Sequence, residues 1–244
     1  MEWRGEGLII GVRRHGESSA IVELMTPLNG RHLGLVRSGR SRRMQPVLQL
    51  GNSVSAHWYA RLDEHLGTFT LELEQARAAA LMESASGVHG VQWLCALLRL
   101  LPEREAHPAL YQSALIVLDH LIKIDVAAPL LARFELGLLS ELGFGLALDE
   151  CAATGAREDL IYVSPKSGRA VSRSAGAPYR DRLLSLPQFL RDSLSDPAAQ
   201  DLADAYSLTG YFMERDIFGP RGTSLPTARD SFLSCLNMRK SNAE

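Results

Sequence analysis

Residues 19–37, which read SAIVELMTPLNGRHLGLVR, contain the pattern that decides the fold. An apolar run covers Ala20–Met25, and apolar residues return at alternate positions in Arg31–Arg37, as is typical of two β-strands. Between them stands Asn29-Gly30, a dipeptide that favours a two-residue type I′ turn, because both turn positions need positive φ. The stretch therefore predicts an antiparallel hairpin with strands near 19–26 and 31–37.

Three further segments on either side of this hairpin have strand character. Leu8–Val12 is a short apolar run, while Asn52–Tyr59 and Thr68–Leu73 alternate apolar with polar residues. Five short strands with glycines at the corners suit a small closed barrel, so residues 1–80 are predicted to form a domain of the OB type. An SH3-like barrel has the same strand count and stays open as the alternative.

Beyond the strands, apolar residues recur at helical spacing and predict helices over 87–101, 107–124, 130–142, 186–194, 198–217 and 227–238. The connection between 144 and 187 is rich in Gly and Pro, and Leu160–Val163 with Ala170–Val171 predicts a minimal hairpin within it. The expected fold class is α+β. It has an N-terminal five-stranded OB-type β-barrel at 1–80 and a mainly α-helical domain at 81–244, with a loop-rich insertion at about 144–185.

The formal net charge of −2 is unevenly distributed along the 244 residues. Residues 1–62 contain nine Arg against four Glu, an excess of +5, so the remainder carries −7. Such a split indicates that the N-terminal part meets a polyanion, and the alternative is a chance excess of Arg on a solvated surface.

Composition also bears on the compartment. No run of 18 apolar residues predicts a membrane-spanning helix, and the first residues lack the pattern of a signal peptide. Cys95, Cys151 and Cys235 lie far apart and form neither a disulfide framework nor a metal site, which fits a reducing cytoplasm.

The sharpest local feature is Arg37-Ser38-Gly39-Arg40-Ser41-Arg42-Arg43, which connects two predicted strands. Guanidinium forks suit phosphate oxygens, while Gly and Ser keep a loop adaptable. Bases bound to such barrels usually stack on aromatic side chains, and the candidates are Trp58, Tyr59 and Phe69. The competing interpretations are a merely solvated loop and aromatic rings that belong to the core. The predicted DNA-binding residues are Arg13, Arg14, Arg37, Arg40, Arg42, Arg43 and Trp58.

Catalytic motifs are missing from the sequence. It contains no GxxxxGK[ST] phosphate loop, no GxSxG elbow and no HExxH motif, and its seven His form no metal-ligand spacing. Cys95 lies among leucines of a predicted helix and is interpreted as a core residue. The sequence therefore predicts a protein that is not an enzyme and has no catalytic residue.

Three groups of residues, in this order along the chain, resemble the RecO family of recombination mediators. The first is Glu6–Ile10 with Gly16–Val22 and Gly30-Arg31-His32; the second is Arg133–Leu136 with Leu142-Gly143-Phe144, Leu148-Asp149 and Cys151; the third is Tyr162–Ala170. Together they cover the chain nearly end to end. The resemblance implies an OB domain, a helical domain and an insertion that binds zinc through four cysteines in many members.

This chain departs from the zinc-binding pattern. The frame C-x2-C-x17-C-x2-C would place ligands at Cys151, Thr154, Ser172 and Ala175, of which only the first is a cysteine. Neutral hydroxyls do not replace the soft, anionic thiolates that zinc prefers. We therefore expect no metal and no other cofactor, and we expect packing and turns to support the insertion.

The resemblance also implies the role. Members of the family bind single- and double-stranded DNA, anneal complementary strands and load the recombinase onto strands coated by single-strand-binding protein. They work with a RecR-type partner and contact the acidic C-terminal tail of the coating protein, so the expected location is the cytoplasm, at the nucleoid. An apolar pocket near Arg133 is the candidate for the tail. The alternative is a protein-interaction scaffold whose barrel binds a protein.

Overall fold

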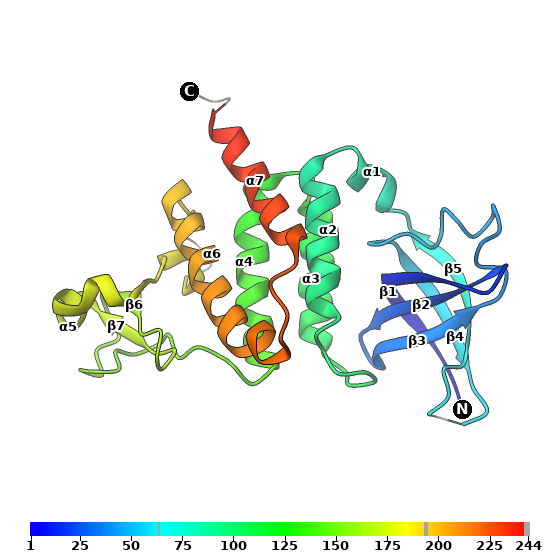
Figure 1. Cartoon of the computed structure of the whole chain (residues 1–244), viewed down its shortest axis with the longest axis horizontal. Coiled ribbons are helices and arrows are strands. Elements are labelled where there is room, and N and C mark those ends of the chain that lie inside the picture. Colours follow the sequence, from blue (N-terminus) through cyan, green and yellow to red (C-terminus); the bar gives the residue numbers. More distant parts are fainter. Residues whose placement is uncertain (63, 193–194, 242–244) are drawn as a thin grey trace. The chain divides into compact units, whose positions relative to one another are not determined.

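The computed structural model describes residues 1–62, 64–192 and 195–241, which divide into two compact units (Figure 1). One unit contains Met1–Ala127 together with the chain from Pro226 onward, and the other is Ala128–Leu225. This division groups the first helices after the barrel with the barrel itself, because they pack against it.

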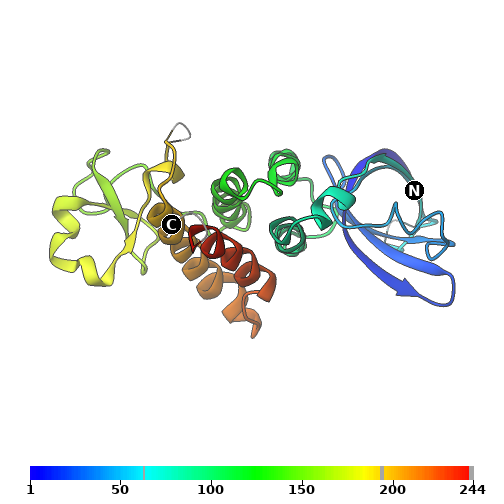
Figure 2. The ribbon, with the colours of Figure 1, turned by 90° about the horizontal axis from the view of Figure 1, so that it is seen from above.

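Five strands open the first unit, and their bounds are β1 (Glu2–His15), β2 (Ser19–Thr26), β3 (Gly30–Val36), β4 (Ser53–Tyr59) and β5 (Thr68–Gln75). They pair in the closed order β1-β2-β3-β5-β4, with β4 antiparallel to β1 and β5 parallel to β3. In Figure 2 these strands curve round into a ring. This Greek-key order is that of the OB fold and decides against the SH3-like alternative.

Strand β1 is longer than the predicted run Leu8–Val12, because its two halves pair with different strands. Its residues 2–8 pair with β4 and its residues 8–15 pair with β2. The first half contains charged residues and glycines, so apolar periodicity did not reveal it. Side chains that alternate inward along the strands form one buried core, which includes Val22, Leu24, Val54 and Phe69.

The predicted hairpin of β2 and β3 forms, but the expected type I′ turn is wrong. Thr26 pairs with Gly30, so the turn has three residues, 27–29. Among the described residues of this turn and its flanks, only Gly30 has a positive φ, +61°, whereas a type I′ turn needs two such residues. The Thr26 hydroxyl accepts the Asn29 N–H at 3.0 Å and stabilises the turn.

Helices α1 (Ala78–Met82), α2 (Ala85–Leu98), α3 (Pro108–His120) and α7 (Thr227–Ser241) complete the first unit. The Ser84 hydroxyl caps α2 by accepting the Gly87 N–H at 3.0 Å. Helix α2 packs closely on α7, since a Cβ at Gly90 would stand 3.3 Å from the Phe232 ring. The helices predicted over 87–101, 107–124 and 227–238 are therefore present, with shifted ends.

The second unit begins within α4 (Ile124–Glu141), which starts before the predicted residue 130 and so contains Pro129. A small sheet of order β7-β6-β8 follows, from β6 (Leu160–Val163), β7 (Ala170–Ser172) and β8 (Leu184–Ser185), and it contains the predicted minimal hairpin. The remaining elements are α5 (Arg173–Gly176), η1 (Ala177–Arg182), η2 (Gln188–Leu190), α6 (Ala199–Met213), η3 (Glu214–Phe218) and η4 (Gly219–Arg221).

The helix predicted over 186–194 is wrong within the part that the structure describes. Only the single turn η2 forms, and residues 193–194 lie outside the described residues. The Leu186 N–H donates to the Ile161 carbonyl at 2.8 Å beside the small sheet. The Phe189 carbonyl accepts from Arg133, so these backbone groups serve tertiary contacts.

Candidate nucleic-acid interface

The arginine-rich loop, residues 37–43, follows β3 and packs against the start of β2. Gly39 is buried, and a Cβ there would lie 2.8 Å from the Ala20 Cβ and 3.1 Å from the Ala20 nitrogen. A side chain at this position would collide with Ala20, so the absence of a Cβ permits the close approach. The preceding Ser38 has a φ of +53°, which turns the chain at this contact.

Arg40 attaches the loop to the turn between β1 and β2. Its backbone N–H donates to the Ser18 carbonyl at 3.0 Å. Its guanidinium Nη1 donates to the Glu17 carbonyl at 2.6 Å and to the Gly16 carbonyl at 3.4 Å. The side chain of Arg40 therefore has a structural role, and the loop has a defined position on the barrel.

Five other predicted arginines lie in this loop or on β1 beside it, and we call them the basic end: Arg13, Arg14, Arg37, Arg42 and Arg43. Arg14 pairs with Ala20, which in turn pairs with Val36, so β1 and β3 bring their arginines to the same end of the barrel. All five are exposed, and no carboxylate of the described residues forms a salt bridge with them. Like charges repel at such a cluster, and a bound polyanion relieves the repulsion.

Trp58 does not share this surface. It is 1% exposed and its indole N–H donates to the Leu66 carbonyl at 3.1 Å, so its ring belongs to the barrel core. This placement corrects the expectation that bases stack on Trp58, since the structure offers them no exposed face of that ring. Phe69 is buried as well, whereas Tyr59 is 56% exposed because adjacent strand residues face opposite sides.

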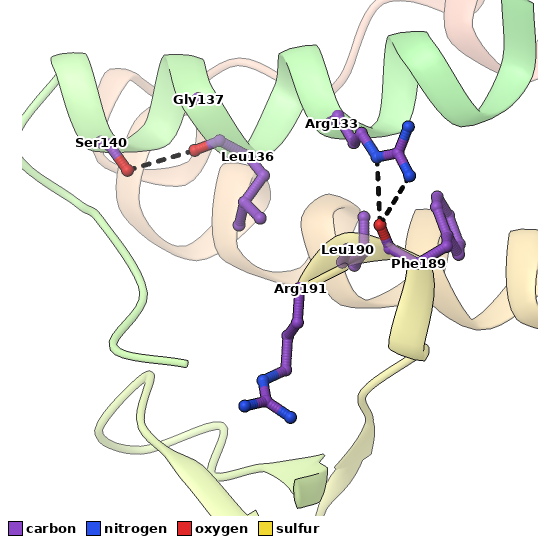
Figure 3. A pocket seen from close by; sticks show the side chains of 7 residues that line it. All are labelled: Arg133, Leu136, Gly137, Ser140, Phe189, Leu190 and Arg191. Atoms are coloured by element: carbon purple, nitrogen blue, oxygen red, sulfur yellow. Dashed lines mark hydrogen bonds between the residues drawn. The ribbon is translucent and has the colours of Figure 1, made fainter. Parts of the chain in front are cut away.

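A pocket of about 400 Å³ lies in the second unit, between α4 and the turn η2 (Figure 3). Arg133 Nε and Nη2 donate to the Phe189 carbonyl at 3.0 and 2.9 Å, and the guanidinium lies 5.5 Å from the centre of the Phe189 ring. Leu136 adds an apolar wall. Arg191 extends away from α4 in Figure 3, and its Nε donates to the Leu148 carbonyl at 2.9 Å.

Arg133 lies in this pocket as predicted, but its partner Phe189 was not among the predicted residues. A helix was predicted at residue 189. In a helix the Phe189 carbonyl would accept a backbone N–H, so it was not expected to accept from Arg133. The pocket combines an apolar surface with a guanidinium, which suits a ligand that carries both apolar and carboxylate groups.

The frame that the family resemblance implied for zinc contains a hydrogen-bonded thiol in this chain. Cys151 is 1% exposed, the Ser172 N–H donates to its Sγ at 3.2 Å, and the Ser172 hydroxyl lies 3.4 Å from Sγ. Burial raises the pKa of the Cys151 thiol, but hydrogen bonds from Ser172, Thr154 and the backbone outweigh it and lower the pKa to about 6.

These residues do not fit zinc, because one sulfur and two neutral hydroxyls make a poor donor set for this ion. Among the described residues, no three His, Cys, Asp or Glu side chains stand close enough together to hold a metal ion. Within the same residues, every helix is too short or too polar to span a membrane.

Comparison with known proteins covers both parts of the chain. A family model described as "Recombination protein O N terminal" matches residues 1–77, and one described as "Recombination protein O C terminal" matches residues 86–225. The chain is similar to a DNA repair protein RecO of Methylocella silvestris, with 58% identity over 242 residues that cover 98% of each chain. A DNA repair protein RecO of Mesorhizobium japonicum is 58% identical over 239 residues, which cover 97% of this chain and 94% of that relative.

Proposed function

The chain belongs to the RecO family of recombination proteins, and we propose that it acts in DNA repair and recombination by holding DNA at the basic end. The observation that carries the proposal is the cluster of five exposed arginines without carboxylate partners among the described residues. Gly39 and Arg40 position this cluster on the barrel. The proposal involves binding alone and assigns no covalent step to any residue.

Binding follows from the chemistry of the guanidinium group. Each arginine that contacts a phosphate releases condensed counterions, which drives association at low salt. Arg13 and Arg14 are neighbours on β1 and project to opposite sides of the strand, so phosphates on either side meet a cation. Two strands whose phosphates are neutralised repel each other less, and complementary strands then anneal more readily.

The pocket beside α4 supports a second part of the proposal, contact with the acidic C-terminal tail of a single-strand-binding protein. Leu136 and Phe189 offer apolar surface, and the Arg133 guanidinium, which already donates to the Phe189 carbonyl, contributes the positive charge that attracts a carboxylate. A protein that holds both the tail and the strand is placed to help load the recombinase onto coated DNA, with a RecR-type partner. We accordingly place its work in the cytoplasm, at the nucleoid.

The decisive experiment measures binding of single-stranded DNA across a salt series. The variant Arg37→Ser/Arg42→Ser/Arg43→Ser removes three cations of the basic end. We expect weaker binding. We also expect the salt slope, the slope of the logarithm of the binding constant against the logarithm of the salt concentration, to be smaller by about 2, since each phosphate contact on a single strand contributes ~0.7.

The matched control, Arg61→Ser/Arg157→Ser/Arg221→Ser, removes the same charge from exposed positions elsewhere. If both triple variants lower the slope equally, the basic end has no special role. If the wild-type chain binds no DNA at low salt, the protein-interaction scaffold replaces the proposal.

The tail contact is tested separately with a synthetic peptide of the acidic tail. Arg133→Ala is expected to weaken peptide binding about 10-fold, from the loss of one charge-assisted hydrogen bond of ~1.5 kcal/mol. Ser140→Ala changes the same pocket without removing a charge and should bind as the wild type does. Equal affinity of Arg133→Ala and the wild type would exclude this pocket as the tail site.

A further inference from the structure

A second cationic surface lies on the segment 173–182, which forms α5 and η1 in the unit Ala128–Leu225. The segment reads RSAGAPYRDR, with three arginines and one aspartate. Element η1 contains no buried residue, Tyr179 is 60% exposed, and the Arg180 side chain is 73% exposed. A single exposed aromatic ring is ordinary, but a ring among arginines is the pattern on which single-stranded nucleic acids stack.

The backbone of this segment is fixed by contacts with the small sheet, which position its exposed side chains. Gly176 is buried against Tyr162, and a Cβ at Gly176 would stand 2.5 Å from Cδ2 of that ring. The Arg173 N–H donates to the Asp159 carbonyl at 2.9 Å. These contacts fix the backbone of α5 to the small sheet, while η1 projects its side chains into solvent.

The arginines are available to an incoming anion. Arg173 Nε lies 3.1 Å from Asp159 Oδ1, and both side chains are more than half exposed. Arg180 lies 3.5 Å from the neighbouring Asp181, again with both side chains exposed. Exposed pairs of this kind contribute little, so a phosphate can replace the carboxylate. No carboxylate of the described residues forms a salt bridge with Arg182.

We propose that Arg173, Tyr179, Arg180 and Arg182 form a second contact site for single-stranded nucleic acid, with one base stacked on Tyr179 and phosphates bound by the arginines. The proposal rests on the DNA-binding function proposed above. It gives the unit Ala128–Leu225 its own contact with the nucleic acid. A protein partner fits less well, because such interfaces are anchored by side chains in buried pockets, and η1 buries nothing. A net charge of +2 over ten residues with one open ring suits phosphates and a base.

The test uses the full chain and a thymidine oligonucleotide that carries photoreactive 5-bromouracil. Irradiation of the complex should attach the oligonucleotide to Tyr179, as read by peptide mass spectrometry. Arg180→Ser/Arg182→Ser should lower the salt slope by about 1.4, from ~0.7 per contact. Its control, Lys166→Ser/Arg221→Ser, removes the same charge from exposed positions of the same unit and should change the slope less.

Ring chemistry is tested apart from charge. Tyr179→Ala should weaken binding about 5-fold or more, the lower end of ~1–3 kcal/mol for one stacked base, with little change of the salt slope. Tyr179→Phe keeps the ring and should restore wild-type affinity.

The outcomes separate this site from the basic end. The adduct at Tyr179 should persist in Arg37→Ser/Arg42→Ser/Arg43→Ser, because the second site does not depend on that loop. Wild-type binding with no adduct at Tyr179, and with Arg180→Ser/Arg182→Ser equal to its control, overturns the second site alone. Absence of any binding by the wild-type chain overturns both proposals.

Discussion

Replacing Gly39 by alanine tests whether the basic end depends on the position of its loop as well as on its charge. The new methyl group would stand 2.8 Å from the Ala20 Cβ, and 3.1 Å from the Ala20 nitrogen and the Val36 carbonyl oxygen. Ala20 and Val36 pair with each other in the sheet, so neither moves freely. Adding a methyl to a packed site costs about 1–3 kcal/mol, and the loop must shift to relieve it.

We expect two measurable effects of Gly39→Ala. The free energy of unfolding in urea should fall by about 1–3 kcal/mol, followed by circular dichroism. If the displaced loop loses one phosphate contact, affinity for single-stranded DNA should fall about 10-fold and the salt slope by about 0.7, measured by fluorescence anisotropy. The charge of the protein is unchanged, so simple electrostatics predicts no such loss.

A second substitution identifies the cause. Ala20→Gly in the Gly39→Ala background removes the nearest methyl and should restore part of both the stability and the affinity. The reasoning is refuted if Gly39→Ala is destabilised yet binds DNA with the affinity and salt slope of the wild type. That result would mean that the arginines act wherever the loop lies.

Three further predictions concern the framework that supports the two proposed surfaces. Arg77→Ala should lower the free energy of unfolding by about 2–3 kcal/mol, read from urea midpoints, because buried Arg77 joins the barrel to α3 through a 2.6 Å contact with Asp119. Gly30→Ala should lower stability more, because a Cβ there would stand 1.9 Å from the Glu105 carbonyl oxygen and the backbone has a φ of +61°. The midpoint temperature of thermal unfolding of the purified variant measures this loss. A midpoint equal to that of the wild type would contradict the close approach. The pKa of Cys151 in the folded protein, about 6, lies below that of a free thiol, so the Cys151 thiolate stabilises the folded state. Its contribution to the free energy of unfolding is complete above the free-thiol pKa and is lost as the pH falls through about 6. Urea unfolding across this range should therefore show a stability that rises with pH in the wild type and rises less in Cys151→Ala.

Local sequence patterns were sufficient where a strand has one buried face and an alternation of apolar residues along its length. Strands β2 to β5 lie close to their predicted positions because alternation of apolar residues follows directly from the pleat. Strand β1 was predicted only in part, since its first half is paired with β4 without an apolar pattern of its own. The turn η2 was predicted as helix because the contact of Arg133 with the Phe189 carbonyl joins residues that are far apart in sequence.

The sequence by itself determined the hairpin of β2 and β3, the helical character of the later chain and the concentration of arginine in one loop, because these depend on neighbouring residues. Only the tertiary structure decided which arginines are available. It assigns Arg40 to the backbone of the β1–β2 turn, leaves Arg37, Arg42 and Arg43 exposed, and buries Trp58 in the core. Exposure and partner choice depend on where distant segments come together, and residue type alone does not contain that information.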